Sequence, residues 1–346
     1  MATVDVTIYG AGAFGLAVGY ACASRGAKVR VIDPNGVASG SSGGLVGALA
    51  PHVPENWNTK KAFQFDSLIM AEAFWSEVER VSGESCGYLR SGRVQPLADD
   101  RAVDLAQARA VTAADLWQGQ AEWSVLSVDQ FGAWAPKSET GLVVFDTLTA
   151  RIHPRRATRA LAAGIIALGG EVVSEAKPEG QVVYATGWRG MVDLSEQLGK
   201  SVGGGVKGQA ALLRYDAADL PQLFADSLHI VPHADGTVAI GSTSEREFES
   251  PNAVDHQIED VIARAIGAFP VLKGAEVIER WAGVRPRAKS RAPMLGQHPA
   301  IDGAFIANGG FKIGFGMAPK VGAVMADLIL DGIDHIPDGF RPEDSL

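Results

Sequence analysis

Residues 4–15 have the sequence VDVTIYGAGAFG, in which a short apolar run meets the pattern G-x-G-x-x-G. A helical pattern follows, and residues 28–33 (KVRVID) form a second apolar run that ends on an acid. In such a unit Gly10 permits the tight turn, Gly12 lets a pyrophosphate approach the backbone, and Gly15 lets helix and strand pack closely. The stretch predicts a dinucleotide site with its phosphates at a helix N-terminus. A structural strand–helix–strand unit without a ligand is the alternative.

The residues around this unit are the predicted contacts of the adenosine and phosphate groups. Asp33 lies roughly 20 residues beyond the glycines, where an acid accepts hydrogen bonds from ribose hydroxyls. The loop over residues 34–44 is rich in Gly and Ser, whose hydroxyls can donate to phosphate. We expect residues 45–51 to form a short helix under the ligand. The cofactor contacts expected here are Gly10, Gly12, Ala13, Phe14, Gly15, Asp33, Pro34, Ser39, Ser41, Ser42, Gly44 and Leu45.

The composition of the 346 residues is that of an ordinary globular protein, with 47% hydrophobic and 21% charged residues. The net charge of −9 argues against broad nucleic-acid binding, because phosphate neutralisation needs a basic surface. Two cysteines, Cys22 and Cys86, make no disulfide framework and fit a reducing cytoplasm. We expect no metal site, no membrane-spanning run and no cleaved leader, because the chain enters its first strand almost at once.

The order of the predicted elements indicates an α/β fold with two domains. Strand and helix patterns return over residues 151–187 after an insertion, and residues 207–241 contain alternating strands with a hairpin turn at Ala-Asp-Gly. We predict a discontinuous Rossmann-type cofactor domain over residues 1–85, 150–200 and 280–346. A mostly antiparallel β substrate domain is predicted over residues 86–149 and 201–279.

Three later stretches carry further candidate site residues. The strand that ends in Ala185-Thr186-Gly187-Trp188 brings small residues to a second edge of the ligand. Arg285 follows an apolar strand and precedes a proline, which holds its backbone extended, so its guanidinium suits a bidentate grip on a carboxylate. An ion pair to an acid of the protein is the alternative for Arg285. A second glycine turn between strand and helix supplies Gly310, Phe311, Lys312, Ile313 and Gly314.

Taken in this order, these stretches resemble the D-amino-acid oxidase and glycine oxidase family of FAD-dependent oxidoreductases over essentially the whole chain. The segments that carry the resemblance are residues 10–15 with Asp33, 39–47, 185–187, 208–209, 229–245, 281–296 and 309–319. Residues 281–286 (WAGVRP) together with residues 293–296 (PMLG) are the most specific of them.

The resemblance implies a non-covalent FAD in the α/β domain and a ring that faces the β domain. It implies oxidation of an amine or amino acid with a carboxylate by hydride transfer to the flavin, with dioxygen or another acceptor reoxidising it. By the same resemblance Arg285 holds the substrate carboxylate, and Lys312 and His229 stand where the family pattern has an arginine and a tyrosine. We expect His229 to titrate near neutrality.

Three other functions stay open at this point. The first is FAD-dependent oxidation of a modified tRNA wobble-uridine amine, because residues 38–51 also resemble the FAD domain of such an enzyme. The second is oxidation of an α-hydroxy acid, which presents the same carboxylate. The third is a flavin-binding protein without turnover. The substrate side chain, its chirality and the oligomeric state are not predicted.

Overall fold

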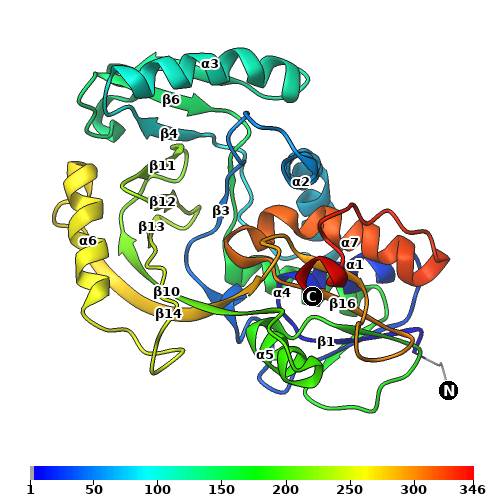
Figure 1. Cartoon of the computed structure of the whole chain (residues 1–346). Coiled ribbons are helices and arrows are strands. Elements are labelled where there is room, and N and C mark those ends of the chain that lie inside the picture. Colours follow the sequence, from blue (N-terminus) through cyan, green and yellow to red (C-terminus); the bar gives the residue numbers. More distant parts are fainter. Residues whose placement is uncertain (1–3) are drawn as a thin grey trace.

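The computed structural model describes residues 4–346, which form two large sheets with helices around them (Figure 1). The first sheet has six strands. In sheet order these are β15 (Met294–Gln297), β16 (Ala304–Asn308), β9 (Gln181–Tyr184), β1 (Val6–Tyr9), β2 (Val29–Ile32) and β8 (Glu171–Val173). All neighbours are parallel except the β15–β16 pair. The carboxyl ends of β16, β9, β1 and β2 therefore share one edge.

The second sheet has eight mostly antiparallel strands. In sheet order these are β14 (Glu276–Ala288), β10 (Gly203–Arg214), β13 (Thr237–Gly241), β12 (Leu228–Pro232), β11 (Gln222–Ala225), β4 (Arg93–Pro96), β6 (Leu142–Asp146) and β5 (Trp123–Ser127). The two long strands β10 and β14 run from this sheet toward the first one (Figure 1). A small third sheet pairs β3 (Ala48–Leu49) with β7 (Ala150–Arg151).

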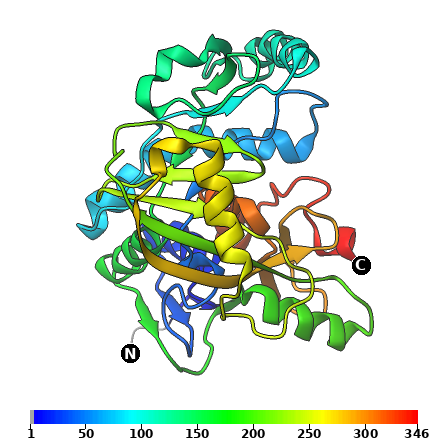
Figure 2. The ribbon, with the colours of Figure 1, turned by 90° about the vertical axis from the view of Figure 1, so that its left-hand side faces the viewer.

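Helices cover both sheets. The α-helices are α1 (Ala13–Ser24), α2 (Thr59–Ser82), α3 (Asp100–Leu116), α4 (Pro154–Ala167), α5 (Gly187–Leu198), α6 (Gln257–Ala268) and α7 (Gly314–Asp331). The 3₁₀ turns are η1 (Ser41–Gly43), η2 (Val128–Trp134), η3 (Pro270–Leu272), η4 (Phe311–Ile313) and η5 (Pro342–Ser345). Figure 2 shows α6 lying across the outer face of the eight-stranded sheet, where its apolar side packs on β10, β12 and β13.

The helices α1, α4 and α7 pack on the six-stranded sheet, and α2 packs on α4 and α7. Their apolar faces, with the sheet strands, make the largest core cluster of the described residues. Within residues 4–346, the stretch Phe311–Asp331 is long and apolar enough to cross a membrane by length and composition. It packs against α1 and α2, as a core helix does.

Most predicted elements are confirmed, and two details differ. Residues 45–51 are not helical, because the backbone of Ala48–Leu49 pairs with Ala150–Arg151 about a hundred positions away. The expected domain boundary at residue 280 falls inside β14, which continues to Ala288 along β10. The two-domain division itself stays a prediction. Both cysteines are free and buried, as expected.

Candidate active site

The predicted cofactor stretches meet at the carboxyl edge of the six-stranded sheet. Gly10 follows β1, Asp33 follows β2, Ala185 follows β9 and Gly309 follows β16. Ligands of open α/β sheets bind at this edge, outside the strand ends. Four segments that are far apart in the sequence therefore present their turns to one place.

Close backbone packing explains why glycines stand in the opening turn. A Cβ on Gly10 would lie 2.3 Å from the carbonyl oxygen of Ala185, and Gly10 has a φ of +110°. A Cβ on Gly15 would lie 2.0 Å from the carbonyl oxygen of Gly10. A Cβ on Gly12 would meet only the Ser42 hydroxyl, at 3.2 Å. Gly10 and Gly15 thus hold helix and strand together, while Gly12 leaves its side of the turn open.

Polar groups around the turn are arranged for a dinucleotide. The Ala13 N–H at the start of α1 donates to Ser42 Oγ at 2.9 Å. One carboxylate oxygen of Asp33 accepts from the Ala11 N–H at 2.9 Å, and the other from the Asn35 N–H at 3.0 Å. The helix N-terminus, the hydroxyls and the carboxylate are the group types that bind pyrophosphate and ribose. The glycine cradle and this donor set fit an FAD.

The other predicted cofactor residues differ in their placement. Phe14 packs on the second glycine turn, because a Cβ on Gly310 would lie 2.8 Å from its ring. Leu45 is buried, and its carbonyl accepts from His233 Nε2 at 3.0 Å. Trp188 packs edge-on against Phe248, with ring centroids 6.1 Å apart, and lines neither cavity described below. Pro34 and Ser39 are exposed and do not line these cavities either.

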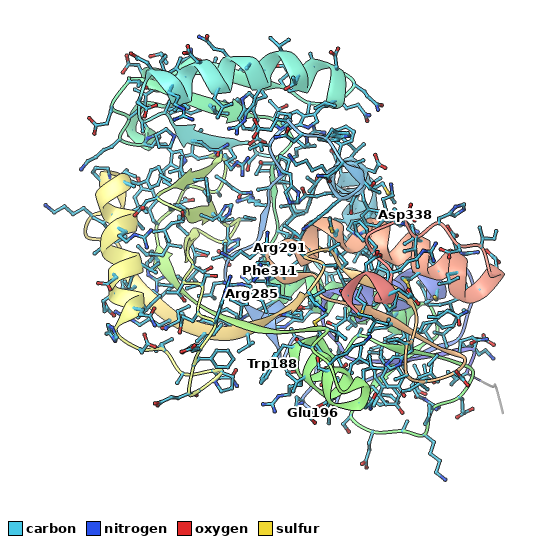
Figure 3. All side chains as sticks on the ribbon, in the orientation of Figure 1. Trp188, Glu196, Arg285, Arg291, Phe311 and Asp338 are labelled. Atoms are coloured by element: carbon cyan, nitrogen blue, oxygen red, sulfur yellow. The ribbon has the colours of Figure 1, made fainter. Side chains whose placement is uncertain are left out.

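Two cavities lie where the sheets meet. The smaller, of about 90 Å³, is lined by Ala13, Ser41, Ser42, Gly44, Gly314 and Arg285, among others. The larger, of about 400 Å³, is lined on one side by the second glycine turn. Phe311 and Lys312 line both. Figure 3 shows Arg285, Phe311 and Arg291 lying one above another at this junction.

Arg285 is held in place without an acid. Its Nη2 donates to Ser242 Oγ at 2.6 Å and its Nη1 to the Thr243 carbonyl at 3.4 Å. The guanidinium lies directly on Gly208, where a Cβ would come within 2.1 Å of both Nη atoms. Within residues 4–346, Arg285 forms no ion pair. The alternative of an internal ion pair is thus excluded for the described residues.

Burial lowers the pKa of Arg285 to about 10, and the Glu245 carboxylate opposes that shift. The guanidinium is therefore charged at neutral pH. A charge that is taken out of water without a partner is costly, and an anion placed against it removes much of that cost.

The strand register aims Arg285 and His229 at the same region. Alternation along β10, β12, β13 and β14 puts Arg285, Trp281, Ala210, Gly241 and His229 on one face of the sheet. Ala210 and Leu45 are buried in one apolar cluster against which the half-buried Trp281 packs, which places this face against the loop after β2. The small residues Ala210 and Gly241 leave room between His229 and Trp281.

The expectation that His229 titrates near neutrality is wrong. Burial lowers its pKa to about 3, with smaller contributions from the positive charges of Arg93 and Lys312. Its ring lies against Phe224 with centroids 4.6 Å apart, and its Nδ1 has no hydrogen-bond partner among the described residues. His229 is thus neutral at ordinary pH.

Several side chains around the larger cavity were not predicted. They are Lys60, Arg287 and Arg291, and His52 stands beside them. One signal was available for Arg287, since it lies two residues after Arg285 and thus on the same face of the strand. A signal was also available for Lys60, because a lysine in the first turn of a helix is unfavourable next to the positive end of the helix dipole.

The chain is similar to known proteins over most of its length. The model of a family described as FAD dependent oxidoreductase matches residues 5–328. A glycine oxidase of Bacillus licheniformis is 25% identical over an alignment of 350 positions, which covers 94% of this chain and 93% of that protein.

Solved structures have the same fold. The glycine oxidase of Geobacillus kaustophilus superimposes with a TM-score of 0.83 at 21% identity, over 97% of both chains. The iminodiacetate oxidase of Chelativorans sp. BNC1 superimposes with a TM-score of 0.82 at 22% identity, over 97% of this chain and 98% of that one.

Proposed function

The chain belongs to the family of FAD-dependent oxidoreductases, and we propose that it oxidises an amine or amino acid whose carboxylate is bound by Arg285. The FAD, when bound, supplies the hydride acceptor. The coarser assignment, an FAD-dependent amino-acid or amine oxidoreductase of the glycine oxidase type, follows from the family and its relatives. We propose in addition that the substrate has a carboxylate and that Arg285 holds it.

The observation that carries this proposal is the state of the Arg285 guanidinium. It is charged, oriented by Ser242 and Thr243, and free of any ion pair among residues 4–346. A planar guanidinium held in this way binds a carboxylate through two parallel N–H groups. The cavity that it lines also contains the loop and glycine-turn residues assigned to the flavin.

The remaining groups of the site position the substrate. Trp281 and the small residues Ala210 and Gly241 give the sheet a flat apolar face beside Arg285. Fixing the carboxylate at one end aligns the carbon to be oxidised with the acceptor. Such alignment makes the reaction of the two groups effectively unimolecular, which accounts for a large part of the rate enhancement. His229 is neutral and adds no charge to this face. A cytoplasmic location is part of the proposal and fits the free thiols of Cys22 and Cys86.

Arg285→Ala tests the proposal in the FAD-loaded enzyme. Loss of the carboxylate contact should lower kcat/KM by about 10²-fold or more with the best amine or amino-acid substrate. Arg280→Ala is the matched control, because Arg280 lies on the opposite face of β14 and pairs with Glu259 at 2.8 Å. The visible spectrum of bound FAD shows whether each variant is folded.

The substrate panel is an anaerobic flavin-reduction screen with glycine, sarcosine, D-amino acids, L-proline and α-hydroxy acids. We expect amines with a carboxylate to bleach the flavin. Reduction by hydroxy acids alone would replace an amine substrate with an alcohol at the same site. Equal kcat/KM for Arg285→Ala and the unsubstituted enzyme would remove Arg285 from the site.

A further inference from the structure

The larger cavity has an unusual set of side chains. Four of its lining residues are cationic, namely Lys60, Arg287, Arg291 and Lys312. No acidic side chain lines it among the described residues, although the chain as a whole has a net charge of −9. Positive charge is therefore concentrated at this place against the overall balance.

None of the four cations is neutralised by the protein. Within residues 4–346, no ion pair involves any of them. Lys60 Nζ instead donates to the Arg291 carbonyl, and the Arg287 guanidinium lies 5.4 Å from the centre of the Phe311 ring. Neither contact cancels a charge.

The cations also lie close enough to repel one another. Burial lowers the pKa of the Lys60 ammonium first, and the charges of Arg291 and Arg287 lower it further. The pKa of Lys312 is lowered by burial and then by Arg285 and Arg287. Lys60 also lies in the first turn of α2, and this first turn contains no acidic residue. Lys60 and Arg287 are half-buried, whereas Arg291 and Lys312 are exposed, so an anion from solvent can reach all four charges and reduce their repulsion.

The cavity continues from the site of Arg285. Phe311 and Lys312 line both cavities, and Arg287 lies two residues beyond Arg285 on the same face of β14. The Cα atoms of two such residues are about 7 Å apart along a strand. In the view of Figure 3, Arg291 and Phe311 lie above Arg285.

The pyrophosphate of the cofactor does not account for these charges. The smaller cavity is lined by Ala13 of the opening glycine turn and by Ser41 and Ser42. None of these residues lines the larger cavity. The cationic cavity thus lies away from the turn assigned to the phosphates.

We infer that the cationic cavity binds a second anionic group of the substrate, so that the enzyme acts on dicarboxylic amino acids or amines. This rests on the proposed function, because it extends the same substrate beyond the carboxylate held by Arg285. One carboxylate lies on Arg285, and the other lies among Lys60, Arg287, Arg291 and Lys312. His52 is half-buried beside them; burial lowers its pKa, so it contributes no charge at neutral pH.

Matched substrate pairs test the inference in the FAD-loaded enzyme. The pairs are aspartate and asparagine, glutamate and glutamine in both chiral forms, and iminodiacetate and sarcosine. We expect kcat/KM to be at least about tenfold higher for the acidic member, because a charge-assisted contact replaces a neutral one. Raising the ionic strength from about 0.05 M to about 0.5 M should reduce this preference, since screening weakens attraction between charges.

Substitutions of the cavity residues locate the effect. Arg287→Gln, Arg291→Gln and Lys60→Gln should each reduce the preference for the acidic member by about five- to tenfold, mostly through a higher KM for that member. Lys61→Gln is the matched control. Lys61 is the next residue, but its ammonium donates to the Val53 carbonyl at 3.1 Å and does not line the cavity.

A binding measurement separates this inference from the proposed oxidation. Titration of the FAD enzyme with succinate and with butyrate, followed by calorimetry, should show tighter binding of the dianion and a loss of that difference in Arg287→Gln. If amines are oxidised but acidic and neutral members react alike and succinate binds no better than butyrate, the inference is overturned and the oxidation stands. If no amine reduces the flavin while succinate still binds more tightly, the oxidation is overturned and the anion site is supported.

Discussion

The two glycine turns of the six-stranded sheet each join a strand to a helix, but they differ in the groups that pack against their glycines. The first, between β1 and α1, is packed backbone against backbone at Gly10 and Gly15. The second, between β16 and α7, is packed against side chains, and its Phe311 and Lys312 face both cavities. The first turn therefore provides a fixed cradle, whereas the second presents side chains to the ligand.

This contrast explains why one turn is generic and the other specific. Backbone N–H groups and a helix dipole bind phosphate in any dinucleotide enzyme, whatever the substrate. The side chains of the second turn act only together with residues from other elements, such as Arg285 and Arg287 of β14. Changes in the first turn should thus affect folding and FAD binding, and changes near the second should affect substrate.

The largest effect is expected for Gly15→Ala. The new methyl group would meet the Gly10 carbonyl, which cannot move without breaking the turn, so the free energy of unfolding should fall by about 3 kcal/mol or more. Gly314→Ala is the counterpart in the second turn, since no atom lies within 4 Å of its Cβ position and its φ is −52°. Its apoprotein should stay within about 0.5 kcal/mol of the parent.

Urea unfolding of both apoproteins, with an FAD titration of each, measures this difference. Gly314 lines the smaller cavity, so Gly314→Ala should bind FAD less tightly although it is stable. Similar losses of stability in the two variants would contradict the contrast between the turns.

The next effect concerns the loop after β2. His233, which follows β12 of the eight-stranded sheet, donates a hydrogen bond to the Leu45 carbonyl of this loop. Burial lowers the pKa of His233 from 6.5 to about 4, while the unfolded chain keeps the ordinary value. The unfolded state therefore binds more protons between these values. Stability is full above about pH 6.5 and falls as the pH drops toward 4, by up to roughly 3 kcal/mol from this group.

His233→Gln removes the titrating group and should flatten that part of the pH dependence. The measurement is the free energy of unfolding from urea curves between about pH 4 and pH 7. His256→Gln, at an exposed histidine, is the control and should leave the slope unchanged. An unaltered slope in His233→Gln would mean that His233 does not remain neutral in the folded protein.

Sequence reasoning predicted both glycine turns between a strand and a helix, and the structure confirms this placement, while their contacts with a cofactor stay predictions. The spacing of Gly10, Gly12 and Gly15 is a local rule, so one chain suffices to recognise it. Lys60 and Arg291 reach the cavity only because α2 and the segment that follows β14 meet the second turn in the fold, and no local pattern records that. The neutrality of His229 depends on burial, which comes from neighbours on other strands.

The smallest effect is expected at the hydroxyl that joins the loop to the first turn. Ser42 Oγ accepts the hydrogen bond from the Ala13 N–H, and Ser42→Ala should lower the free energy of unfolding of the apoprotein by about 1 kcal/mol. Ser41→Ala is the matched control, because the Ser41 side chain lines the same cavity but makes no hydrogen bond among the described residues. Urea unfolding of the two apoproteins should show a loss only for Ser42→Ala. If Ser42→Ala lowers the free energy of unfolding no more than Ser41→Ala does, the loop is fixed by its backbone, as the first turn is, and the Ser42 hydroxyl serves the ligand alone.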